Sequence, residues 1–154
     1  MSENNTIKGY IEHIIKSCGF AVLATENNGQ PHVSLIAITP LGNCRHLVFA
    51  TYRNSLKYRN IKDNNKVAVL IENEDANEKD LKERIVLTII GYTEEISITG
   101  NEEACRAHLK RHPGMESFML SSDCTLIKVI AQSYQVVKGI DDIRWITADK
   151  LDAS

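Results

Sequence analysis

The residues best suited to chemistry lie together in residues 47–61, LVFATYRNSLKYRNI. An apolar strand pattern runs into a polar turn and then into the start of a helix that Asn54 or Ser55 can cap. The first backbone N–H groups of a helix have no internal partners and carry partial positive charge. Together with the hydroxyls of Thr51 and Ser55 and the ammonium group of Lys57, they predict a cradle for a phosphate group.

The same segment also fits a simpler structure, a capped helix whose basic face is solvated. Arg53 precedes the predicted helix, and Lys57 and Arg59 lie in its first turns. Capped helices are common and phosphate sites are rare, so the segment taken alone favours the simpler structure. Both interpretations stay open at this level.

A second group of candidate ligands lies on a predicted helix over residues 101–112. Cys105, His108 and His112 are spaced i, i+3 and i+7, so they share one face on which thiol and imidazole groups could meet a metal ion. The glutamate of a HExxH arrangement is missing, however, and a histidine followed by a proline is also a good end for a helix. We therefore expect no metal site.

Periodicity predicts the elements that position these residues. Ile7, Ile11 and Ile14 belong to one apolar helical stripe, which ends at Cys18-Gly19. Six apolar or alternating runs predict strands, with a bend at Gly91 in the fifth; the sixth could also be two strands broken near residues 132–133. These runs are residues 20–25, 32–39, 46–51, 66–71, 85–98 and 124–137.

Turns and helices separate the strands. Residues 27–30 and 40–43 have turn chemistry, and the charged residues 72–84 predict a solvated loop. A short helix is expected over residues 55–62. Thr99 and Glu102 predict a capping box for the helix over residues 101–112, which Pro113-Gly114 ends.

Composition excludes several classes of partner. The 154 residues include 18 Lys and Arg and 20 Asp and Glu, which gives a net charge of −2. A protein that binds a nucleic acid or an anionic membrane typically has an excess of positive charge, so this composition indicates neither partner. The N-terminus shows no secretory signal, and no stretch is long enough for a membrane span. The four cysteines form no CxxC pair and suggest reduced thiols. We expect one domain over residues 1–154, located in the cytoplasm.

Two long segments carry a resemblance to a known family. GFAVLATENNGQPHVSLIAITP and HLVFATYRNSLKYRNIKDNNKVAVLIEN resemble the core of the FMN-binding split barrels of the pyridoxamine-phosphate-oxidase-like superfamily. In that family the second strand follows a G-x-P turn, and the third strand ends in a small-Thr-x-x-x-Ser-x-Lys pattern before a helix with an Asn near its end. The residues at those places here are Ala50, Thr51, Ser55, Lys57 and Asn60.

The second half is similar to one branch of this superfamily, the haem-utilisation-type and pyridoxamine-phosphate-oxidase-related proteins. IVLTIIGYTEEI, AHLKRHPG and SYQVVKGIDDIRWI match its strand with a glycine, its helix ending in His-Pro and its terminal strand with Gly and Trp. The resemblance runs in the right order from about Gly19 to Trp145. The order of the motifs is more specific than any one of them.

The resemblance implies a mostly β, α+β fold: a six-stranded antiparallel split β-barrel with Greek-key topology and flanking helices. It implies a homodimer with FMN at the subunit interface, and an FMN-dependent oxidoreductase acting on a small molecule. The alternative is a protein that binds or senses FMN or haem without catalysis, or a haem-utilisation-type protein. The implied cofactor-binding residues are His32, Val33, Ser34, Leu35, Ala50, Thr51, Tyr52, Ser55, Leu56, Lys57, Asn60 and Trp145.

Some of these residues have other possible roles. His32 and His46 could ligate haem or transfer protons, although a plain place on a surface strand is commoner for such residues. Trp145 could pack in a core or an interface, or form an aromatic wall beside a flavin ring.

Two departures from the family pattern limit the expected activity. The true oxidases commonly carry a basic residue directly before the phosphate-binding lysine, where this chain has Leu56. They also end in an Arg-Leu-His segment that binds pyridoxal phosphate, whereas this chain ends IRWITADKLDAS. We therefore do not expect authentic pyridoxamine phosphate oxidation. Weaker binding of the FMN phosphate would also permit a protein that contains little FMN.

Overall fold

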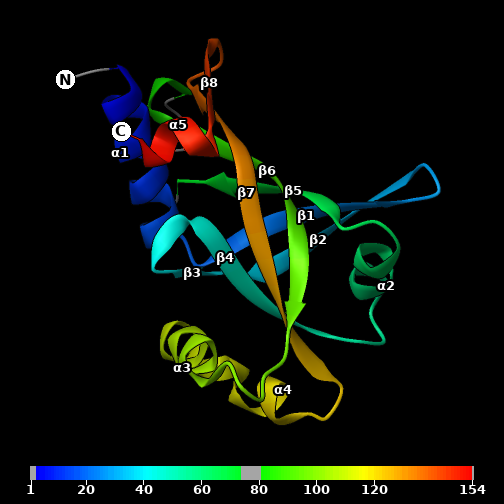
Figure 1. The fold of residues 1–154 in the computed structure, drawn as a ribbon. Coiled ribbons are helices and arrows are strands. Elements are labelled where there is room, and N and C mark those ends of the chain that lie inside the picture. Colours follow the sequence, from blue (N-terminus) through cyan, green and yellow to red (C-terminus); the bar gives the residue numbers. More distant parts are fainter. Residues whose placement is uncertain (1–2, 74–80, 154) are drawn as a thin grey trace.

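One antiparallel sheet dominates the computed structural model, which describes residues 3–73 and 81–153. Its strand order is β2-β1-β5-β6-β7-β4-β3, and β8 pairs with β7 outside this path (Figure 1). The strands are β1 Phe20–Asn27, β2 Gln30–Ala37, β3 Thr39–Leu41, β4 Asn43–Tyr52, β5 Lys66–Glu72, β6 Ile85–Ile96, β7 Cys124–Lys138 and β8 Asp142–Thr147.

Five α-helices flank the sheet within the described residues: α1 Glu3–Ser17, α2 Leu56–Asp63, α3 Glu102–Arg111, α4 Glu116–Leu120 and α5 Ala148–Asp152. Short 3₁₀ turns occupy Leu81–Glu83 and Pro113–Met115. Figure 1 shows α1 and α5 at one end of the long strand β7, α3 and α4 at the other, and α2 apart from both pairs. None of the helices in residues 3–73 and 81–153 is long and apolar enough to cross a membrane.

The long strand β7 organises the sheet. It pairs with β6 along its whole length, with β4 over its first half and with β8 over its second half. The sheet curls, and β2 also contacts β4. The fold is therefore the expected split β-barrel with flanking helices.

Side chains alternate between the two faces of the sheet, as the period of a strand requires. The inner face and the apolar stripe of α1 form one core, in which Leu23, Phe49, Val69, Ile89 and Tyr134 are buried. A second, smaller core lies on the other face, where Val48 and Leu126 are covered by α3 and α4. The barrel is thus apolar inside, and its outer face is covered by helices at only one end.

The bend predicted in β6 is a β-bulge. The pairing of β6 with β7 shifts register between Ile90 and Gly91. A Cβ atom on Gly91 would overlap the carbonyl oxygen of Ile130, so no side chain fits at this position. β7 continues through the bulge, and the version of the prediction with one long strand is the correct one.

All six predicted strands are present, but several details differ from the expectation. β3 and β8 add two strands, α4 and α5 add two helices, and only Gly42, with φ of 73°, retains the turn conformation expected of residues 40–43. The predicted capping box is wrong: α3 is capped at Asn101 without a side-chain hydrogen bond, and Glu102 instead accepts from the Gly100 N–H. Residues 74–80 of the predicted loop lie outside the described residues.

Candidate functional site

The barrel interior becomes polar at the end that α2 covers. Four buried threonines line this end: Thr25, Thr51, Thr93 and Thr125. Thr25, Thr51 and Thr93 are hydrogen-bonded to α2 or to residues within two positions of its ends, and Thr125 is hydrogen-bonded to Glu95, which in turn binds α2. Buried Asn60 of α2, for example, donates to the Thr25 hydroxyl at 3.0 Å. Buried polar groups need hydrogen-bond partners, so this end of the barrel fixes the position of α2.

The predicted phosphate cradle forms where β4 leads into α2. Ser55 caps the helix by accepting from the Tyr58 N–H at 3.3 Å, and its hydroxyl donates to the Tyr52 carbonyl at 2.8 Å. The Thr51 hydroxyl lies 2.9 Å from the Ser55 hydroxyl. The two side chains are therefore adjacent, beside N–H groups at the start of a helix that has no acidic residue in its first turn.

The charges around the cradle are distributed unevenly. Arg53 pairs with Glu95 at 3.4 Å, and the Lys62 ammonium lies 5.9 Å from the centre of the Tyr58 ring. Lys57 is half-buried, and among the described residues nothing pairs with its ammonium group. Lys57, in the first turn of α2, is thus a basic side chain available to an anion at the cradle.

Glu95 connects the elements around this site. One carboxylate oxygen accepts from the Tyr58 hydroxyl at 2.7 Å, and the other accepts from the Thr125 hydroxyl at 2.9 Å and contacts Arg53. Burial raises the pKa of Glu95. The hydrogen bonds from Tyr58 and Thr125 and the charge of Arg53 together lower the pKa by more than burial raises it, so it lies below its usual value. Burial and the bond to Glu95 also raise the pKa of Tyr58. Glu95 is therefore a fixed negative charge.

A cleft adjoins the start of α2. It has a volume of about 380 Å³ and is lined by His32, Leu56 and Asn60 together with the β1–β2 turn. His32 and Ser34 point to the inner side of β2, and the His32 Nδ1 and Ser34 Oγ atoms are buried without a hydrogen-bond partner in the described structure. A buried polar atom without a partner is costly, so these two atoms are candidates for contact with a ligand.

Other predicted cofactor residues point away from this cleft. Val33 and Leu35 lie on the outer face of β2 and are 64% and 69% exposed. Ala50 and Tyr52 pack in the second core, where the Tyr52 ring stacks on Phe118 with centroids 4.0 Å apart. Of the twelve predicted residues, the structure thus gathers six around the cleft and cradle: His32, Thr51, Ser55, Leu56, Lys57 and Asn60. Ser34 lies on the same face of β2 as His32 but does not line the cleft.

Trp145 lies far from the cradle within one chain. It pairs with Gln135 on β7, whereas Thr51 pairs with Thr125, ten residues earlier on the same strand. Ten residues of strand span about 33 Å. Trp145 is 57% exposed, so it does not belong to the core of its own chain.

Each of the two candidate histidine ligands on α3 has a protein partner at one ring nitrogen. Nδ1 of the fully buried His108 lies 2.8 Å from the Thr39 hydroxyl, and His112 Nε2 lies 2.8 Å from the Ile38 carbonyl. Burial and the charges of His112 and Arg111 lower the pKa of His108 to about 4. The two histidines therefore hold α3 against the junction of β2 and β3.

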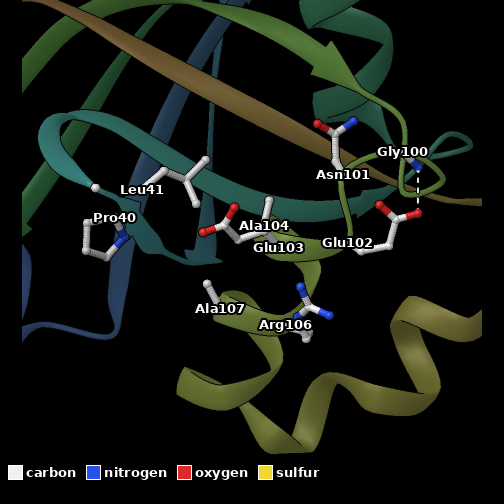
Figure 2. A pocket seen from close by; sticks show the side chains of 10 residues that line it. Pro40, Leu41, Gly100, Asn101, Glu102, Glu103, Ala104, Arg106 and Ala107 are labelled. Atoms are coloured by element: carbon white, nitrogen blue, oxygen red, sulfur yellow. Dashed lines mark hydrogen bonds between the residues drawn. The ribbon is translucent and has the colours of Figure 1, made fainter.

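A larger cleft lies away from the cradle, and Figure 2 shows it between the β3–β4 turn and the start of α3. Its volume is about 600 Å³, and Glu102, Glu103 and Arg106 form its polar rim. None of the predicted cofactor residues lines it. The smaller cleft beside α2 is the better candidate site, because His32 there has an unpartnered atom and the cradle adjoins it.

The comparison with family models identifies the class of the protein. The model described as pyridoxamine 5'-phosphate oxidase matches residues 7–136. The chain belongs to this family, as the sequence motifs predicted. No curated protein matches it significantly.

Solved structures share the fold at low sequence identity. A haem-binding protein from Mycobacterium smegmatis is 21% identical with a TM-score of 0.83, over 95% of this chain and 60% of that one. ChuZ from Campylobacter jejuni is 17% identical with a TM-score of 0.80, over 97% of this chain and 62% of that one. This chain therefore spans about three fifths of the length of both proteins.

A putative pyridoxamine 5'-phosphate oxidase from Listeria innocua is 17% identical with a TM-score of 0.68, over 86% of this chain and 98% of that one. The neighbours thus include both oxidase-like and haem-binding proteins, and at these identities the likeness establishes the fold alone.

Proposed function

We propose that this chain binds FMN with the phosphate at the start of α2, and that it acts as an FMN-dependent oxidoreductase on a small molecule. The observation that carries the proposal is Lys57, a half-buried cation without a counter-ion in the described structure, beside the coupled hydroxyls of Thr51 and Ser55. A phosphate there would receive charge-assisted hydrogen bonds from Lys57 and from N–H groups of the first helical turn.

The cleft beside α2 fits the rest of such a ligand. His32 Nδ1 supplies a buried polar atom that needs a partner, and Leu56 supplies an apolar wall. Ser34 Oγ, a second such atom, lies two residues along the same face of β2. Bound flavin supplies the redox chemistry itself, while the protein supplies binding, orientation and electrostatics. The side chain of Leu56 cannot donate to the phosphate, so Lys57 has to neutralise the phosphate without help from that position.

The outer face of the sheet supports a homodimer. Apolar side chains on six neighbouring strands follow the pairing register across this face, and exposed ones among them include Val33, Leu35, Leu70, Ile90, Ile143 and Trp145. An exposed apolar patch that crosses a whole sheet indicates a protein interface. We propose a second copy of this chain as the partner, because a two-fold interface uses the same patch on both subunits.

This dimer would complete the cofactor site. Leu35 and Trp145 lie at opposite ends of one row across the sheet, which runs through Val22, Leu70, Thr88 and Gln135. A two-fold axis parallel to the strands brings opposite ends of the row together, so the partner's Trp145 would approach β2. That arrangement would explain why Trp145 is exposed and distant from the cradle of its own chain.

The absorption spectrum and an FMN titration test the proposal. Purified protein should show flavin bands, or gain them on addition of FMN, and NADH or NADPH should reduce the bound flavin. Turnover with an electron acceptor distinguishes an enzyme from a protein that only binds or senses the cofactor. A colourless protein that takes up no FMN would refute the proposal.

Haem is the second candidate cofactor, favoured by one observation in this chain. His32 has a ring nitrogen without a partner, and neutral imidazole is a good ligand for iron. A Soret band that appears on addition of haem and disappears in a His32→Ala variant, without any uptake of FMN, would favour haem over flavin.

A further inference from the structure

Arg53 lies next to the cradle and could add a positive charge to that of Lys57, but its guanidinium is paired with a carboxylate. Its guanidinium contacts Glu95 Oε2 at 3.4 Å and donates to the Ser122 carbonyl at 3.4 Å. Its backbone N–H donates to the Asp123 carbonyl at 2.9 Å, so the main chain is held as well as the side chain. Arg53 stands two residues before Ser55, within one side-chain length of the cradle.

The carboxylate that holds Arg53 is itself fixed from two sides. Tyr58 of α2 and Thr125 of β7 donate to it at 2.7 and 2.9 Å. Three donors thus orient Glu95 on the inner face of β6, beneath the turn that leads into α2. The neighbouring Glu94 points to the opposite face, where it pairs with Lys128 at 3.7 Å.

We propose that Glu95 sets the anion affinity of the cradle by holding Arg53 away from the phosphate and cancelling its charge. This inference rests on the proposed function, because it concerns the same phosphate. The pair of Arg53 and Glu95 is neutral as a whole, so Arg53 adds little net charge to that of Lys57 at the dianionic phosphate of FMN. Glu95 is therefore a positioning residue that makes FMN binding weaker and more exchangeable than the basic residues of the segment suggest.

Equilibrium titrations with FMN and with riboflavin, which has no phosphate, test this role. Removing one negative charge several ångströms from a dianion near the surface should tighten FMN binding about three- to tenfold in Glu95→Gln. Riboflavin affinity should stay unchanged, and the gain for FMN should largely disappear in 1 M salt. Glu94→Gln is the matched control: it changes the net charge by the same amount on the opposite face, and it should leave both affinities near wild type.

A double-mutant cycle separates charge from folding damage. Arg53→Gln alone leaves Glu95 uncompensated and should weaken FMN, whereas Arg53→Gln with Glu95→Gln restores the neutral pair and should return the affinity close to wild type. If Glu95 only supported the fold, Glu95→Gln would weaken FMN and riboflavin together and lower the melting temperature. That result, or unchanged FMN affinity, would overturn the inference while leaving the proposed function intact. Wild-type protein that bound no FMN would overturn both.

Discussion

Substitution of Lys57 by alanine gives the sharpest test of the phosphate cradle. A charge-assisted hydrogen bond contributes about 1.5–3 kcal/mol, which corresponds to roughly a ten- to hundredfold loss of FMN affinity. Lys57 is half-buried and has no counter-ion in the described structure, so the upper part of this range applies more than the small values of exposed ion pairs. Riboflavin should bind the variant and the wild type equally.

The assay is a titration that follows flavin fluorescence, with Arg59→Ala as the control. Arg59 lies on the same helix but is exposed, so its loss changes the net charge equally and should alter FMN affinity much less. The melting temperature of both variants without cofactor should stay near wild type, because neither side chain is part of the core. Equal losses for FMN and riboflavin in Lys57→Ala, or no loss for either, would mean that the phosphate binds elsewhere.

Three further predictions concern stability and assembly. Gly91→Ala should lower the free energy of unfolding in denaturant by about 1–3 kcal/mol or more, because the added Cβ overlaps a backbone carbonyl. Gly9→Ala is the control: it lies on the open, exposed face of α1 and should raise the free energy of unfolding by about 0.5–1 kcal/mol. The pKa of His108 is lowered from 6.5 to about 4, so the stability that the neutral ring contributes is complete above pH 6.5 and is lost as the pH falls to about 4. The loss amounts to about 3 kcal/mol, and His108→Gln should flatten this part of the stability curve. Leu35→Asp on the outer face should convert a dimer into monomers in light scattering. Leu120→Asp on α4 is the control and should not, because Leu120 is 79% exposed but lies outside the apolar patch of the strands. A wild-type monomer with FMN bound at full occupancy would contradict the dimer.

The sequence predicted the parts of the fold that carry strong local patterns. The apolar stripe of α1 and the six longer strands were found because burial on one face repeats along each element. β3 has three residues and α4 and α5 have five each, too few for a period to be recognised. Periodicity did not predict β8 as a separate strand, because Ile143 and Trp145 are exposed on the outer face; the resemblance alone matched this segment to a terminal strand.

Part of the candidate site could also be predicted from a local pattern, and part of it could not. The neighbouring Thr51, Ser55 and Lys57 were predicted from one short segment, because a strand end and a helix start bring them together locally. Glu95 lies 42 residues from Arg53 in the chain, and only the pairing of β6 with β7 and the position of α2 bring the two side chains into contact. No local motif signals such a pair.

A crystal structure of the complex with FMN tests the central claim most directly. The proposal predicts that phosphate oxygens lie within hydrogen-bond distance, about 2.7–3.2 Å, of Ser55 Oγ and Lys57 Nζ, with the partner's Trp145 near the same flavin. A phosphate bound in the cleft of Figure 2, or a flavin held by one subunit alone, would contradict it.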